Sequence, residues 1–98
     1  MGQRDSHLDG WDILNITLDD ADWTNITFPV FGVKYFDIQE QSGTLAVDFR
    51  KSDDSTDEWR IRAGMSRPCY RDNRDSKAGG QVKRVSATET TVQIYYEY

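Results

Sequence analysis

The sequence predicts an all-β fold, a small antiparallel β-sandwich or jelly roll of seven to eight short strands. Two observations lead to this prediction. Apolar residues recur at every second position in several short segments, which is the period of a strand with one buried face. Gly, Pro and polar turn residues separate these segments, and no segment has the 3.6-residue period of an amphipathic helix. With 98 residues, the chain can bury one hydrophobic core and not two.

Four alternating segments are expected to form strands in the first half of the chain. They cover residues 14–18, 23–28, 34–38 and 44–50. Pro29 and Gly32 mark the turn between the second and the third segment. The fourth segment has the clearest alternation, so Leu45, Val47 and Phe49 are expected to point into the core.

Two strong strands and one weak strand are expected in the second half. They cover residues 58–62, 91–98 and, for the weak one, 81–86. Trp59 and Ile61 share a phase and are expected to point inward. Val82 and Val85 differ in phase, which predicts a weak or bulged strand. The stretch 66–80 is nearly without apolar residues and is expected to be the longest irregular segment, and such long loops are often contact surfaces.

The expected organisation is a polar N-terminal arm over residues 1–10 and a single sandwich domain over 11–98. Three Trp, five Tyr and four Phe supply the core material that disordered chains lack. The first residues are polar, so they do not resemble a secretory signal. The apolar runs are far shorter than the roughly 20 residues that a bilayer-spanning helix needs. A membrane is therefore not an expected partner.

Charge is distributed unevenly along the chain. The net charge is −5, which disfavours nonspecific binding to nucleic acid. Residues 1–22 contain six Asp and one Arg, whereas residues 60–84 contain eight Lys or Arg and two Asp. Such segments could pair between neighbouring copies or with a partner protein. The candidate partner-contact residues are Trp11, Asp19, Asp20, Asp22, Arg67, Tyr70, Arg71 and Arg74.

No chemistry of an enzyme is predicted. The chain has one His and no pairing of a base with a nucleophile, and its single Cys excludes an internal disulfide. Cys69 is interpreted as a passive thiol. The acidic stretches around Asp20 and over 53–58 could in principle hold a cation or act as an acid–base pair, but solvated turns explain them better. No catalytic, cofactor-binding or metal-binding residue is therefore assigned.

The order of several segments resembles a family of small virion proteins of tailed bacteriophages. The resemblance rests on residues 21–29, 34–39, 43–49, 59–64 and 85–96. Shared features are a strand that follows an acidic turn and ends at Pro29, the Ala63-Gly64 turn, and a Thr-rich approach to a final aromatic strand. The resemblance implies a non-enzymatic capsid cement or decoration protein, assembled in the host cytoplasm and carried on the virion.

Proteins of this family are compact β-sandwiches or jelly rolls, often trimeric, that strengthen the shell where capsomers meet. The resemblance therefore implies the major capsid protein or other virion subunits as partners, and a homotrimer. A tail, neck or head-fibre component is an alternative within the same class. A small carbohydrate- or receptor-binding module is an alternative from a different class. That module would use Trp11, Trp23 or Tyr95 on an exposed face.

Overall fold

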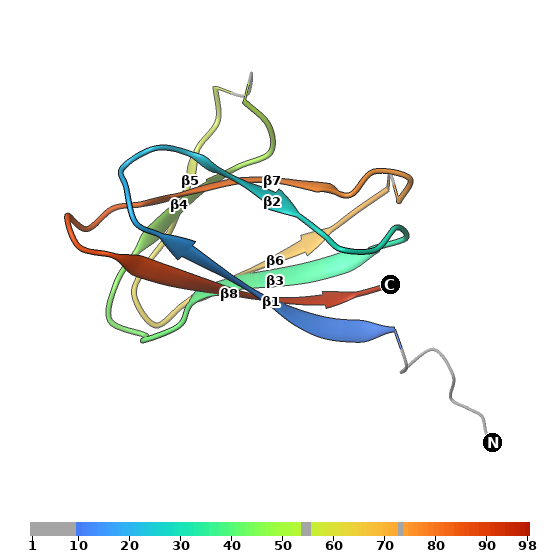
Figure 1. Cartoon of the computed structure of the whole chain (residues 1–98), viewed down its shortest axis with the longest axis horizontal. Coiled ribbons are helices and arrows are strands. Elements are labelled where there is room, and N and C mark those ends of the chain that lie inside the picture. The colour runs from blue at the N-terminus through green and yellow to red at the C-terminus, as the bar shows by residue number, and fades with distance from the viewer. Residues whose placement is uncertain (1–9, 54–55, 73) are drawn as a thin grey trace.

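The computed structural model describes residues 10–53, 56–72 and 74–98 of the chain. In these ranges it has eight β-strands and no helix (Figure 1). The strands are β1 (Trp11–Leu18), β2 (Thr24–Thr27), β3 (Tyr35–Glu40), β4 (Val47–Arg50), β5 (Trp59–Ile61), β6 (Ser66–Tyr70), β7 (Ala78–Arg84) and β8 (Thr90–Glu97). The described part of the chain therefore also has no helix that is long and apolar enough to cross a membrane.

The strands form two four-stranded antiparallel sheets that pack face to face (Figure 1). Sheet A has the order β1-β8-β3-β6, and sheet B has the order β2-β7-β4-β5. The predicted all-β sandwich is thus confirmed, with eight strands at the upper end of the expected number. The predicted arm over 1–10 lies outside the described residues, apart from Gly10.

The core lies between the sheets and is built from the inward positions of both. The buried apolar side chains of sheet A are Leu18, Phe36, Ile38, Val92, Ile94 and Tyr96, and those of sheet B are Ile26, Val47, Phe49, Ile61 and Val82. Phe28, directly after β2, joins the two halves because its ring lies 5.2 Å from the rings of both Phe36 and Tyr96. Aromatic pairs at this spacing add stabilisation beyond their buried area.

The expectation of an irregular segment over 66–80 is wrong at both ends. β6 occupies Ser66–Tyr70 and pairs with β3 at the edge of sheet A. The apolar alternation is missing there because the inward positions carry Arg67 and Cys69 instead of branched aliphatic residues. Pro68 is compatible with this strand because an edge position does not need its missing N–H.

The other end of the same segment belongs to β7, which includes Gly79 and Gly80. These glycines allow neighbouring strands to approach closely. A Cβ atom on Gly79 would lie 2.6 Å from Cε2 of Phe28 and 2.9 Å from Cγ2 of Ile26. Gly80 has a φ of +100°, and a Cβ there would lie 2.6 Å from the carbonyl oxygen of Arg50. The glycines are thus packing residues of a central strand.

The pairing of β7 with β2 contains a bulge, but it lies before the segment 81–86 where the sequence predicted a weak or bulged strand. The register shifts between Asn25 and Thr27, which pair with Gln81 and Ala78, whereas β7 pairs with β4 in continuous register. The phase conflict between Val82 and Val85 has a simple origin. Val82 is buried in β7, and Val85 is exposed after the strand has ended.

Trp59 does not enter the core, contrary to the expectation from its phase. Its partner in that phase, Ile61, is buried, but 54% of the Trp59 surface is exposed. β5 is the edge strand of sheet B, so its first residue lies beside the open side of the sandwich. The Trp59 ring instead packs against the Arg67 guanidinium of β6 at 4.3 Å.

Candidate binding faces of the sandwich

A row of four aromatic rings crosses the outer face of sheet A, with one ring from each strand. In spatial order the rings are Trp11 of β1, Tyr95 of β8, Tyr35 of β3 and Tyr70 of β6. The centroid distances are 5.9 Å for Trp11–Tyr95, 6.3 Å for Tyr95–Tyr35 and 5.0 Å for Tyr35–Tyr70. We call these four residues the aromatic row.

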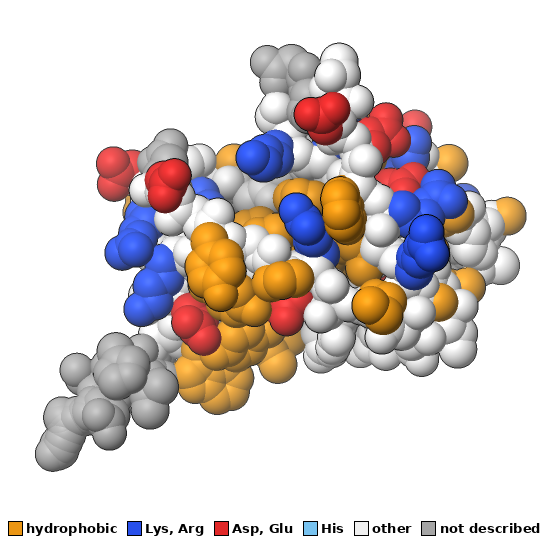
Figure 2. Space-filling view, turned by 180° about the vertical axis from the view of Figure 1, so that it is seen from behind, with side chains coloured by type: hydrophobic (Ala, Val, Ile, Leu, Met, Phe, Trp, Pro, Cys, Tyr) orange, Lys and Arg blue, Asp and Glu red, His pale blue; other side chains and the backbone are white. Residues whose placement is uncertain are grey.

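The strand alternation explains why these rings face outward. Ile94 and Tyr96 point into the core, so Tyr95 between them must point to the other face. The ends of the row are open, because 51% of Trp11 and 85% of Tyr70 is exposed. Figure 2 shows hydrophobic side chains gathered along the lower side of the molecule, where sheet A lies, with acidic side chains beside them.

Two tyrosine hydroxyls of the row are tied to carboxylates on the same face. The Tyr95 hydroxyl donates to Oε2 of Glu97 at 2.7 Å, and this bond, with burial, raises the pKa of Tyr95 to about 12. The Tyr35 hydroxyl donates to Oδ2 of Asp37 over a longer 3.4 Å, and burial followed by the Asp37 charge raises the pKa of Tyr35. The short bond to Glu97 holds the Tyr95 ring in a fixed position, whereas the long contact with Asp37 restrains the Tyr35 ring only weakly.

Two hollows lie on this face beside the row. The first has a volume of about 120 Å³ and is lined by Ile13, Asp37, Gln39, Gln93 and Tyr95. The second has a volume of about 460 Å³ and is lined by Lys34, Tyr35, Tyr70, Arg74 and Glu97. Because Tyr95 lines the first, Tyr35 lines the second and the two rings are in contact, the hollows are neighbours.

The polar groups of the first hollow are weakly engaged. Oδ1 of Asp37 is buried and has no hydrogen-bond partner within the described ranges. Nε2 of Gln39 donates to Oε1 of Gln93 at 3.3 Å, which is a long bond for this pair. A buried acceptor without a donor is costly, so a ligand hydroxyl or amine that reached Asp37 would be stabilised there.

The outer face of sheet B carries a different arrangement, a tryptophan between two cations. The Arg50 guanidinium lies 4.3 Å and the Lys83 ammonium 4.7 Å from the Trp23 ring. Nε of Arg50 also donates to Oε1 of Gln81 at 2.7 Å, which fixes the guanidinium. We call Trp23, Arg50 and Lys83 the Trp23 cluster.

Asp48 and Arg60 form an ion pair beside this cluster. Nε of Arg60 donates to Oδ1 of Asp48 at 2.9 Å, and its second nitrogen donates to Oδ2 at 3.3 Å. This two-point hydrogen bond raises the pKa of Arg60. It also explains how the largely buried Asp48 is tolerated on the outer side of β4.

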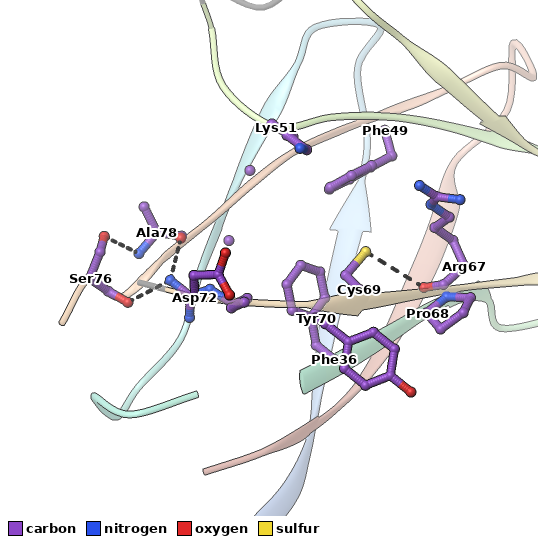
Figure 3. Close-up of a pocket in the computed structure, with 13 residues that line it drawn as sticks. Phe36, Phe49, Lys51, Arg67, Pro68, Cys69, Tyr70, Asp72, Ser76 and Ala78 are labelled. Atoms are coloured by element: carbon purple, nitrogen blue, oxygen red, sulfur yellow. Dashed lines mark hydrogen bonds between the residues drawn. The ribbon is translucent and has the colours of Figure 1, made fainter. Parts of the chain in front are cut away.

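A cleft of about 580 Å³ opens between the two sheets on the β6 side. Figure 3 shows the Cys69 thiol and the Phe49 ring pointing into it from opposite walls. Burial raises the pKa of Cys69 to about 11, so its thiol stays protonated at neutral pH. A protonated thiol is a poor nucleophile, which agrees with the interpretation of Cys69 as passive.

The predicted contact residues separate into different places. Arg67 stacks on Trp59 at the open side of the sandwich. Arg71 donates to the carbonyl oxygens of Val33, Ser76 and Ala78 and so pins its loop to the body of the fold. Burial lowers the pKa of Arg71. Arg74 lines the second hollow.

The acidic residues Asp19, Asp20 and Asp22 form an exposed turn after β1. Oδ1 of Asp20 accepts a hydrogen bond from the Asp22 amide at 2.9 Å, which is an Asx turn. Within the described ranges, no group of three or more His, Cys, Asp or Glu side chains is placed to hold a metal ion. Part of the acidic 53–58 segment lies outside those ranges.

The structure places Trp11 and Tyr70, which are far apart in the sequence, at the two ends of one aromatic row, and Arg74 lines the hollow beside Tyr70. Sequence reasoning did not assign Tyr35, Asp37 or Glu97 to a site. Their signal was present in the phase of β3 and β8, because the residues that alternate with the buried positions of a strand point to its other face. Strand order, which decides that these four strands are adjacent, has no comparable signal.

Comparison with models of known protein families, with curated proteins and with solved structures found no match. The structure itself defines the class of the protein, a small β-sandwich with an aromatic outer surface on sheet A and a cationic outer surface on sheet B.

Proposed function

We propose that this chain is a non-enzymatic virion structural protein of the capsid-decoration type, attached to the phage head through the outer face of sheet B. The resemblance of its segments to small virion proteins of tailed bacteriophages supports the class. The observation that carries the attachment face is the Trp23 cluster. Tail, neck or head-fibre attachment is the alternative position for the same contact.

The Trp23 cluster has the composition of a protein-binding hot spot. Trp and Arg are the residue types that contribute most to protein interfaces. Arg50 is already ordered by the Trp23 ring and by Gln81, so little side-chain entropy is lost when a partner binds. Arg50 and Lys83 add two positive charges, which fit an acidic surface on a capsid subunit.

The proposed mechanism is lattice pinning. A subunit that binds several capsid proteins at once combines several weak contacts into tight binding. Because it binds the assembled shell better than the separate subunits, it stabilises the shell against dissociation. A homotrimer at a threefold position would present three Trp23 clusters to the shell. In this arrangement sheet A, on the opposite side of the sandwich, faces away from the head.

The first experiment measures the solution mass and the thermal stability of heads with and without the protein. We expect a trimer of about three times 11.3 kDa, and heads lacking the protein should burst at a lower temperature. Heads whose bursting temperature is unaffected by the protein would overturn the decoration proposal.

The second experiment tests the attachment face with matched charge reversals. Lys83→Glu should weaken head binding by about tenfold or more, because it places a like charge against an acidic surface. Lys34→Glu makes the same change in charge at the end of sheet A and should leave head binding unaltered. Equal binding by the two variants would exclude the Trp23 cluster as the contact.

A further inference from the structure

We propose that the outer face of sheet A is a binding site for a neutral oligosaccharide, with two sugar subsites at the two hollows. This site lies on the opposite sheet from the Trp23 cluster, so the inference stands independently of the proposed attachment to a phage head. The aromatic row supplies the stacking surfaces, and the hollows supply the polar groups.

The aromatic row fits a flat, partly apolar ligand. One face of a pyranose ring exposes C–H groups that pack on an aromatic ring, while its hydroxyls need hydrogen bonds around the edge. Tyr70 and Trp11 are the open rings at the ends of the row. Between them, Tyr95 is held by its short bond to Glu97, and Tyr35 packs between Tyr95 and Tyr70. Rings fixed on a rigid sheet bind with a small entropy cost.

The hollows contain both donors and acceptors, which is what vicinal hydroxyls require. In the first hollow, Asp37 offers a buried acceptor without a partner in the described part of the chain, and the amides of Gln39 and Gln93 offer both kinds of group. In the second hollow, Glu97 accepts while Lys34 and Arg74 donate. Each sugar hydroxyl can both donate and accept, so it suits such mixed surroundings.

The charges of the face select a neutral ligand. Lys34 and Arg74 contribute two positive charges, and Asp37 and Glu97 contribute two negative charges. A polyanion such as a nucleic acid would meet carboxylates beside its phosphates, and a cationic peptide would meet the ammonium and guanidinium groups. A neutral chain of sugars meets neither penalty.

The spacing of the hollows favours an oligosaccharide over a single sugar. Tyr95 lines the first hollow and Tyr35 lines the second, and these two rings are in contact, so the hollows are neighbours on one face. Two linked sugars can therefore reach both hollows at once. Two linked subsites bind more tightly than either alone.

The test is a titration of the ¹⁵N-labelled full chain with neutral linear hexasaccharides built from glucose, mannose or N-acetylglucosamine. We expect saturable shifts of the Trp11 indole N–H and of the β8 amides with at least one of them. Binding should be unchanged between about 0.05 and 0.5 M salt, because no net charge is neutralised. Absence of saturable binding by all three at 10 mM concentration, on the order of the weakest specific affinities, would overturn the proposal.

Matched variants separate the site from its scaffold. Tyr70→Ala should weaken binding by about tenfold or more, the effect of losing one well-packed ring. Asp37→Asn, which keeps the side-chain shape, should also weaken binding by about tenfold, because a neutral amide oxygen accepts a weaker hydrogen bond than a carboxylate. Trp59→Ala removes an exposed ring outside this face and should bind as the original chain does.

Two other outcomes would replace the proposal. Shifts of the same signals by a hexa-arginine peptide, with no response to the sugars, would make the face a contact for a cationic protein. Concentration-dependent shifts without ligand that are confined to the outer face of sheet A would make this face an interface between copies. Lys83→Glu, on the opposite sheet, should bind sugar as the original chain does. A failure of the head-attachment proposal can therefore be distinguished from a failure of the sugar-binding proposal.

Discussion

The guanidinium of Arg67 lies 4.3 Å from the centre of the Trp59 ring and connects β6 of sheet A to β5 of sheet B. These are the edge strands on one side of the sandwich, where the sheets are not joined by a hydrogen-bonded ladder. Nε of Arg67 is buried and has no hydrogen-bond partner in the described ranges. The cation–π contact with the ring therefore offsets part of the cost of burying this end of the guanidinium.

This contact should be measurable as a coupling energy. In a double-mutant cycle with Trp59→Ala and Arg67→Ala, the free energy of unfolding should show a coupling of about 0.5–1 kcal/mol. Chemical denaturation of the four proteins gives this value. Additive effects of the two substitutions would mean that the stacking contributes nothing to stability.

Glu40 should be a stabilising carboxylate. It is almost fully buried and accepts hydrogen bonds from the amides of Ser42, Thr44 and Leu45 and from the Ser42 hydroxyl. Burial alone would raise the pKa of Glu40, but these bonds outweigh burial and lower it. Glu40→Gln should reduce the free energy of unfolding by about 1–3 kcal/mol, measured by urea denaturation.

The pH dependence of this stabilisation follows from its sign. Because the folded pKa of Glu40 is below the usual 4.5, the contribution is present above that value and is lost as the pH falls through the lowered pKa. The original chain and Glu40→Gln should therefore converge in stability under acid. Glu89→Gln, at an exposed position, serves as the control. A constant difference at every pH would contradict the proposed role.

Cys69 should react slowly with thiol reagents. Its pKa is raised from 9.0 to about 11 by burial, so the thiolate fraction at pH 8 is roughly a hundredfold lower than in the unfolded chain. The rate of modification by a disulfide reagent, with and without denaturant, measures the difference. Equal rates in the folded and unfolded protein would show that the thiol is not protected.

Gly79→Ala should destabilise the fold strongly. The added methyl group would lie 2.6 Å from the buried Phe28 ring, and overpacking of a filled core costs about 1–3 kcal/mol. Gly32→Ala is the comparison, because Gly32 has a φ of +86° with no atom within 4 Å of the added Cβ. It should cost only about 1–2 kcal/mol from backbone strain. A thermal midpoint for Gly79→Ala equal to that of the original chain would contradict this account of β7.

Much of the fold could be predicted because the alternation of buried and exposed residues is a local signal. It located β3 and β8 closely, since Phe36 and Ile94 lie in clear period-two patterns. The strand expected over 44–50 begins only at Val47, and Leu45 lies half-buried before it and outside the core, contrary to the prediction. β6 was missed because an edge strand can place Arg67 and Cys69 inward without an apolar pattern. The glycines of β7 resembled a turn, although close packing against Phe28 is what requires Gly79.

The candidate sites could be predicted only in part. Trp11 and Tyr70 were candidate contact residues and Tyr95 was considered for an exposed face, but nothing in the sequence shows that β1 and β6 are the two edges of one sheet. Tyr35 and Tyr95, which complete the row between them, lie on the strands at its centre. Non-local strand pairing decides which side chains share a surface, and a single sequence does not encode it in any local pattern.

The pairing of β1 with β8 also determines how the domain would respond to a mechanical load. Trp11 lies opposite Glu97, and the Tyr98 amide donates to the carbonyl oxygen of Gly10, so the outer ends of both strands are adjacent. A force that pulled these two ends apart would break the hydrogen bonds of the antiparallel ladder one pair at a time. The same ladder loaded along the strands would have to break its bonds together. A protein that is attached through the outer face of sheet B carries no load through its strand ends. The β1–β8 ladder would then not be pulled in the direction in which it is weakest.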